Sequence, residues 1–128
     1  LTGVAAVSLV VSGIMILVIL FISVVERTKE IGTLRAIGAR AADIRRIFLS
    51  EGTLLGIGSG ITGILIAVIV SGATNRILYR ITGTKLIAIN LPNIFTGILI
   101  SVGISTLASL IPAAKASRLD PVESLRHE

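Results

Sequence analysis

The chain has 128 residues, of which 53% are hydrophobic and 15% are charged, and its formal net charge is +5. Soluble domains carry about a quarter charged residues, so this composition excludes an ordinary water-soluble domain. The sequence contains no cysteine, which excludes disulfides and thiolate metal sites. With one Tyr, three Phe and no Trp, the positive charge indicates loops facing anionic lipid rather than a nucleic-acid site.

Three stretches contain no Asp, Glu, Lys or Arg: residues 1–25, 52–75 and 86–114. Each is longer than the roughly 20 residues that cross about 30 Å of hydrocarbon as a helix. We predict an all-α, polytopic membrane protein with three transmembrane helices, at about 1–25, 47–73 and 92–112. The alternative is a soluble core of buried helices, but the chain has too little polar sequence to cover one.

The first stretch does not have the pattern of a signal peptide. It is too long, and no basic region precedes it. Because the sequence begins with Leu1 rather than Met, we expect further chain upstream of it.

Residues 26–46, between the first two predicted spans, are densely charged. Six of them are basic: Arg27, Lys29, Arg35, Arg40, Arg45 and Arg46. At roughly 2.5–3.5 kcal/mol each, holding six basic residues at the membrane centre would cost about 15–20 kcal/mol. This segment is therefore predicted to lie in water or at the membrane surface.

The first part of this segment predicts a short helix over residues 26–37. Ile31, Leu34 and Ile37 recur at a spacing of three, which keeps them roughly on one side. A solvated hairpin would need fewer polar residues. The apolar side is therefore expected to rest either on the headgroup layer or on a protein partner.

The second part predicts a turn and a new helix. Gly38 suits a left-handed helix end, and the next helix begins near Arg40. Asp43 falls in the first turn of that helix, where its charge favours the helix dipole.

The basic residues also predict the orientation. Nine lie in residues 26–46 and in the tail 113–128, and three lie in the connection 74–91: Arg76, Arg80 and Lys85. The positive-inside rule places residues 26–46 and the C-terminus in the cytoplasm of a multi-pass cell-membrane protein, with the connection outside. That connection contains no acid and is expected to be a solvated connector, with contact to anionic headgroups or a partner domain as the alternatives.

Small residues recur at helical spacing in the second and third predicted spans. The rows contain Gly52, Gly56, Gly60 and Gly63, and then Gly97, Ser101 and Ser105. Such rows let membrane helices approach closely. They predict either packing within the chain or a dimer interface with a second copy.

The sequence predicts further features of the membrane helices at Glu51, Pro92 and Pro112. Glu51, the one acid in a predicted membrane helix, lies near the cytoplasmic entry and is expected to reach the interface, Arg45 or Arg46 rather than act in transport. Pro92 suits the first turn of the last span, and Pro112 suits a kink or a stop near its end.

The tail contains a helix-start pattern. Asp120, Pro121 and Glu123 suit the N-cap, the first and the third positions of a short surface helix over 121–126. His127 is the only histidine and is assigned no role.

Three stretches together carry a family resemblance: "ERTKEIGTLRAIGA" (26–39), "IFLSEGTLLG" (47–56) and "PAAKASRLDPVESLRHE" (112–128). They resemble the FtsX-like permease family of MacB-type ABC transporters. The resemblance covers essentially the whole chain as the last three of four membrane helices, without the first helix and the large extracytoplasmic domain after it. Arg40 departs from the Ser or Thr that often caps the second helix, which weakens that cap by about 1 kcal/mol.

The resemblance implies that the 26–37 helix is a coupling helix that docks on an ABC ATP-binding subunit. The implied docking residues are Glu26, Arg27, Glu30, Ile31, Leu34, Arg35 and Ile37. It also implies a second permease copy, and an extracytoplasmic adaptor is an open possibility.

The sequence contains no P-loop, no H-E-x-x-H and no Ser–His–Asp set, so we expect a permease subunit that is not itself an enzyme. No cofactor is expected on this chain; ATP and Mg²⁺ are expected on the partner ATPase. The predicted function is to couple ATP hydrolysis to export or to extracytoplasmic mechanical work. The alternatives are a non-transporting, FtsX-type regulatory subunit and a lipid-binding membrane scaffold.

Overall fold

The computed structural model describes residues 2–84 and 87–120. Four helices follow in chain order: α1 (Thr2–Glu26), α2 (Thr28–Ala36), α3 (Ala41–Thr82) and α4 (Leu91–Ser117). The described residues contain no strand, so the predicted all-α fold is confirmed. As predicted, three helices (α1, α3 and α4) are long and apolar enough to span a membrane.

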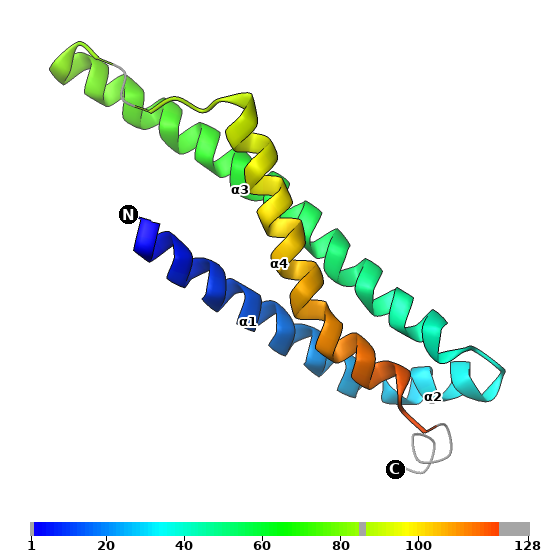
Figure 1. Cartoon of the computed structure of the whole chain (residues 1–128). Helices are drawn as coiled ribbons and strands as arrows, with labels where there is room; N and C mark the ends of the chain where they lie inside the picture. Colours follow the sequence, from blue (N-terminus) through cyan, green and yellow to red (C-terminus); the bar gives the residue numbers. More distant parts are fainter. Residues whose placement is uncertain (1, 85–86, 121–128) are drawn as a thin grey trace.

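The helices form an open, elongated arrangement (Figure 1). α4 runs antiparallel to α3, packs along it, and also packs on α1. α2, the start of α3 and the end of α4 gather at one end of the molecule, here called the α2 end. The N-terminus and the last turns of α3 lie toward the other end, here called the turn end.

The buried hydrophobic core is small and lies at the α2 end. All four helices contribute to it, through Val24, Ile31, Ile44, Phe48, Ala113 and Ala116. Leu20 in α1 is also buried, but most other large apolar side chains are exposed; Ile69, for example, is 70% exposed. An apolar exterior of this extent suits hydrocarbon rather than water, so the outer faces of α1, α3 and α4 are the faces that lipid would contact.

α3 is longer than the predicted span of 47–73. It begins at Ala41, inside the predicted charged segment, and continues to Thr82, so Arg76 and Arg80 lie in a helix and not in a loop. The prediction ended the helix at the polar residues that end the uncharged stretch. Polar residues end a membrane span, but they need not end a helix, and the first residue that stops α3 is Gly83, whose φ is +71°.

α4 also extends past its predicted end. Pro92 lies in its first turn, as expected, but Pro112 does not stop the helix, which continues to Ser117. Pro112 is buried in the last part of α4. A proline removes one backbone donor, and membrane helices tolerate that loss more readily than soluble ones.

The turn between α2 and α3 follows the predicted pattern. Gly38 has a φ of +104°, the left-handed conformation that ends the helix. Arg40 is the N-cap of α3, and its backbone N–H donates to Asp43 Oδ2 at 3.1 Å. The Arg40 side chain has no hydrogen-bond acceptor, so it cannot cap a backbone N–H of α3. Of the two hydrogen bonds of a capping box, only the one accepted by Asp43 is therefore made. The predicted tail helix over 121–126, with Pro121, Glu123 and His127, lies outside the described residues.

Candidate functional site

The predicted coupling helix corresponds to α2, which is joined to α1 by continuous backbone hydrogen bonds. Arg27 N–H donates to Ser23 O at 3.1 Å, and Ile31 N–H donates to Arg27 O at 3.0 Å. The Thr28 hydroxyl donates to the carbonyls of Val24 and Val25 across the same junction. α2 is therefore tied to the end of a candidate membrane span and is not a free surface helix.

One predicted docking residue lies inside the chain. Ile31 is only 4% exposed and belongs to the core with Val24, Ile44 and Phe48. The expectation that Ile31, Leu34 and Ile37 lie on one side is wrong for the outer two, because each spacing of three turns by about 60° and Ile37 lies about 120° around the helix from Ile31. Ile31 holds α2 against the rest of the chain and is not available to a partner.

Three other predicted residues share one exposed face of α2. Glu30, Leu34 and Ile37 follow the i, i+4, i+7 spacing, which keeps their side chains within about 60° of one another. Leu34 is 39% exposed and Ile37 is 77% exposed. We call these three residues the α2 stripe; it is an exposed ridge of two apolar side chains and one carboxylate, and its midline lies about 90° around α2 from Ile31.

The remaining predicted docking residues flank this stripe or lie behind it. Glu26 and Arg27 are exposed at the junction with α1, whereas Arg35 is partly buried. Arg35 lies about 40° around the helix from Ile31, so it belongs to the inner side of α2. Sequence spacing alone did not separate these two sides.

The small-residue rows meet in the contact between α3 and α4. A Cβ added to Gly52 would collide with Ser109, and one added to Gly56 would lie 2.8 Å from the Cα of Val102. At Gly60 the nearest atom would be the Ser101 Cβ at 3.3 Å. The absence of a side chain at these three glycines therefore lets the two backbones approach closely within one chain.

Hydroxyl groups strengthen this contact. Ser101 Oγ donates to the Gly56 carbonyl at 2.9 Å, and Ser101 and Ser59 hydroxyls lie 3.1 Å apart. The hydroxyls of Thr53 and Thr106 lie 3.3 Å apart. Each pair joins α3 to α4, and Ser105 and Ser109 are buried between the two helices.

Two glycines of the predicted rows lie outside this contact. A Cβ at Gly63 or Gly97 would meet no atom within 4 Å. Gly63 lies only about 20° around α3 from Gly52, so it shares the side of Gly52, Gly56 and Gly60 but has no neighbouring atom opposite it. Gly97 lines an open groove with α1 residues such as Ser12 and Met15.

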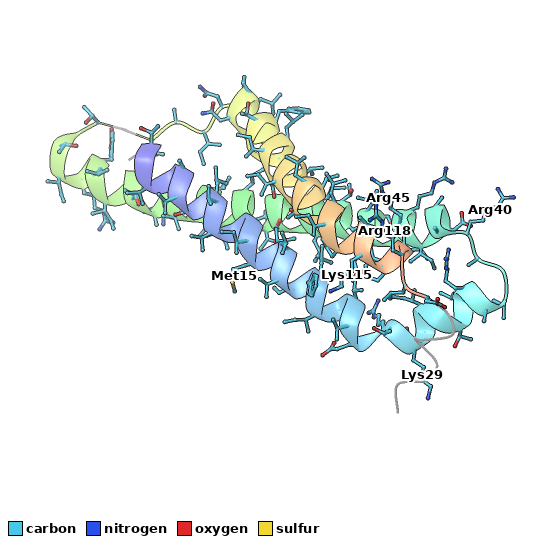
Figure 2. All side chains as sticks on the ribbon, turned by 60° about the horizontal axis from the view of Figure 1, so that its bottom comes forward. Met15, Lys29, Arg40, Arg45, Lys115 and Arg118 are labelled. Carbon is cyan, nitrogen blue, oxygen red and sulfur yellow. The ribbon has the colours of Figure 1, made fainter. Side chains whose placement is uncertain are left out.

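Basic side chains gather at the α2 end. Figure 2 shows Lys29, Arg40, Arg45, Lys115 and Arg118 there, so residues 26–46 and the end of α4 lie at the same end of the molecule. The Lys115 ammonium lies 4.1 Å from the centroid of the Phe21 ring, which links α4 to α1 by a cation–π contact. Sequence reasoning missed this link, because nothing in the sequence pairs a residue in α1 with one in α4.

Glu51 lies in a different environment from these basic residues. It is half-buried in a shallow hollow lined by side chains of α3 alone. Within residues 2–84 and 87–120, no group of three or more His, Asp or Glu side chains is placed to hold a metal ion.

The chain is similar to export proteins of several bacteria. Residues 2–121 match the family described as FtsX-like permease C-terminal. The chain is 40% identical over 128 residues to the pyoverdine export ATP-binding/permease protein PvdT of Pseudomonas entomophila, covering 100% of this chain and 19% of that protein. It is 39% identical over 132 residues to the macrolide export ATP-binding/permease protein MacB of Bdellovibrio bacteriovorus, with the same coverage.

These relatives are much longer than the chain, which spans about a fifth of their length. The match nevertheless covers all four described helices, including α2 and both small-residue rows. The chain belongs to the FtsX-like permease C-terminal family and is a multi-pass membrane domain of the ABC transporter permease class.

Proposed function

We propose that this chain is the membrane-spanning part of an ABC exporter and that the α2 stripe is where the ATP-binding part docks. Because the relatives are named ATP-binding/permease proteins, the ATP-binding part is proposed to lie either on the same polypeptide or on a separate subunit. ATP and Mg²⁺ would be bound there. A second permease copy would complete the exporter, and the cargo is not assigned.

The α2 stripe is the observation that carries this proposal. Leu34 and Ile37 are large, exposed apolar side chains on a segment that Ile31 already anchors in the core. Leu34 and Ile37 are three residues apart, and apolar anchors about one turn apart on a helix commonly fill a groove in a protein partner. Glu30 adds one charge at the edge, which would orient the contact.

The packing of α2 supports transmission of motion. A force on the α2 stripe would act on α1 through the hydrogen bonds at Arg27 and Ile31, and on α3 and α4 through the core around Ile31. Docking would bias the membrane helices only if the ATP-binding part contacts α2 differently in its two nucleotide states. In this arrangement the α2 stripe receives the force, and Ile31 transmits it to the core.

The proposed orientation places the α2 end in the cytoplasm. The basic side chains at this end face the side that positive-inside topology favours, and a cytoplasmic ATP-binding part has access only to that side. The turn end would then face the extracytoplasmic side.

The test uses the full-length protein with its ATP-binding part, reconstituted in nanodiscs. We expect the Leu34→Asp/Ile37→Asp variant to lower ATP hydrolysis more than tenfold, because two carboxylates would enter an apolar groove. Ala36→Asp is the matched control: Ala36 is exposed on α2 but lies about 100° around the helix from Ile37. We expect this control to retain hydrolysis within about twofold.

Unchanged hydrolysis in the double variant, with normal insertion, would contradict docking at the α2 stripe. If that variant instead loses salt-sensitive binding to anionic vesicles, the lipid-scaffold function is favoured. Normal coupling to an extracytoplasmic enzyme without export would favour the regulatory function.

A further inference from the structure

At the turn end, α3 presents two arginines on its outer surface. Arg76 and Arg80 are both exposed and lie one helical turn apart. Asn75, in contrast, faces the returning chain: its side-chain amide donates to Ile87 O at 2.6 Å and its oxygen accepts from Ile87 N–H at 3.1 Å. Arg76 and Arg80 lie about 100° and 140° around α3 from Asn75, so they point away from the rest of the described chain.

The position of these arginines along α3 corresponds to a headgroup layer. The 24 residues between Glu51 and Arg76 carry no charge. As a helix they extend about 36 Å, slightly more than the roughly 30 Å of hydrocarbon in a bilayer. With Glu51 at one membrane surface, Arg76 therefore lies at the opposite surface and Arg80 one turn beyond it.

No acidic residue of the chain lies near these arginines in the sequence. No Asp or Glu occurs between Glu51 and Asp120 in the sequence. Like charges one turn apart on a helix repel each other, and basic residues are disfavoured on the extracytoplasmic side of a membrane. An anionic ligand from outside these residues would relieve both of these costs.

The neighbouring surface has the shape and chemistry of a lipid site. Gly72, Asn75, Arg76, Tyr79 and Arg80 line a shallow hollow on α3. A Cβ at Gly72 would meet nothing within 4 Å, so no other part of the described chain fills the hollow at this position. Toward the membrane centre, the same face carries Leu65 and Ile69, which are 59% and 70% exposed.

We propose that this face of α3 binds an anionic phospholipid in the leaflet opposite α2. Arg76 and Arg80 would hold the phosphate, since guanidinium groups bind phosphate oxygens in a bidentate manner. The Tyr79 hydroxyl would donate to the same headgroup, as aromatic residues at a membrane surface commonly do. One acyl chain would lie along Leu65 and Ile69. The proposal needs the membrane orientation of α3 but does not depend on docking at the α2 stripe.

The experiment measures lipid binding by the full-length protein, purified in dodecyl maltoside micelles and immobilised. Radiolabelled phosphatidylglycerol is titrated in parallel with phosphatidylcholine. We expect the wild type to bind phosphatidylglycerol at least tenfold more tightly. We expect Arg76→Gln/Arg80→Gln to weaken phosphatidylglycerol binding roughly tenfold to thirtyfold and to leave phosphatidylcholine binding unchanged.

Two further variants make the result specific. Arg76→Lys/Arg80→Lys keeps both charges, so its affinity for phosphatidylglycerol should stay within about fivefold of that of the wild type. If the Gln variant fails to insert, this Lys variant still provides a test of the site. Arg45→Gln/Arg46→Gln removes two charges at the α2 end. If it weakens binding as much as the 76/80 variant, the binding is general charge attraction and the proposal fails.

Two more outcomes would overturn the lipid as the ligand. Displacement of phosphatidylglycerol by millimolar inorganic phosphate would mean that the site recognises free phosphate. A photo-crosslinker introduced at Tyr79 in cell membranes should give an adduct of lipid mass. A protein adduct in its place would mean that an acidic protein segment covers the arginines. Equal affinity for the two lipids would also overturn the proposal.

Discussion

The two halves of α3 both carry small residues at helical spacing, but they lie in different environments. In the first half, Ile44, Phe48, Gly52, Gly56 and Gly60 are buried at a spacing of four. The three glycines face Ser109, Ser105 and Ser101 of α4 in turn. In the second half the described residues are at most half-buried, although small residues continue at Gly63, Ala67 and Ser71. The comparison teaches that a row of small residues marks a possible contact, and that a partner helix of the right register must be present to realise it.

The largest expected effect comes from filling the contact in the first half. Gly56→Leu should lower the free energy of unfolding by about 3 kcal/mol or more, because the added side chain would meet the backbone of Val102, which cannot rotate away. Thermal unfolding of the protein in detergent, followed by circular dichroism, measures this. Gly63→Leu is the control and should change the melting temperature little; an equal loss would mean that the second half also packs on a partner.

The two isoleucines of α2 sharpen the comparison between a buried and an exposed face of one helix. Ile31→Ala should lower the stability by about 2–4 kcal/mol, because it leaves a cavity among Val24, Ile44 and Phe48. Ile37→Ala should change the stability by less than about 0.5 kcal/mol. Chemical unfolding of both variants in the same detergent tests this, and equal losses would contradict the two-sided description of α2.

In the exposed half of α3, two hydrogen bonds join the Asn75 side chain to the backbone of Ile87. Asn75→Ala removes two hydrogen bonds from a solvent-exposed site, so we expect a local loss of about 1 kcal/mol and little change in global stability. Hydrogen exchange should show a several-fold faster exchange of the Ile87 amide. Unchanged protection there, or faster exchange throughout α3, would mean that this connection does not act locally.

The smallest expected effect concerns the link between α1 and α4. Phe21→Leu keeps an apolar side chain but removes the ring under Lys115, which should lower the stability by about 0.5–1 kcal/mol. Phe95→Leu is the matched control, because Phe95 is 71% exposed and makes no cation–π contact in the described structure. Equal melting temperatures for the two variants would show that the ring contributes nothing beyond its apolar area.

The candidate site was only partly predictable. The spacing of Ile31, Leu34 and Ile37 placed a short helix with apolar residues correctly, but it could not assign Ile31 to the core and Ile37 to the surface. That assignment depends on Val24, Phe48 and Ala113, which belong to three other helices. The same limit applies to Gly52 and Gly63, which are both glycines of one helix and differ only in what lies opposite them.

The sequence by itself determined the features that depend on consecutive residues. Uncharged stretches predicted three membrane helices, Gly38 predicted a left-handed turn, and three motifs carried the family resemblance. Tertiary structure alone decided the continuation of α3 to Thr82, the burial of Ile31 and the contact of Lys115 with Phe21. The physical reason is range: hydropathy and turn conformation are local properties, whereas burial and pairing are set by residues far away in the chain that packing brings together.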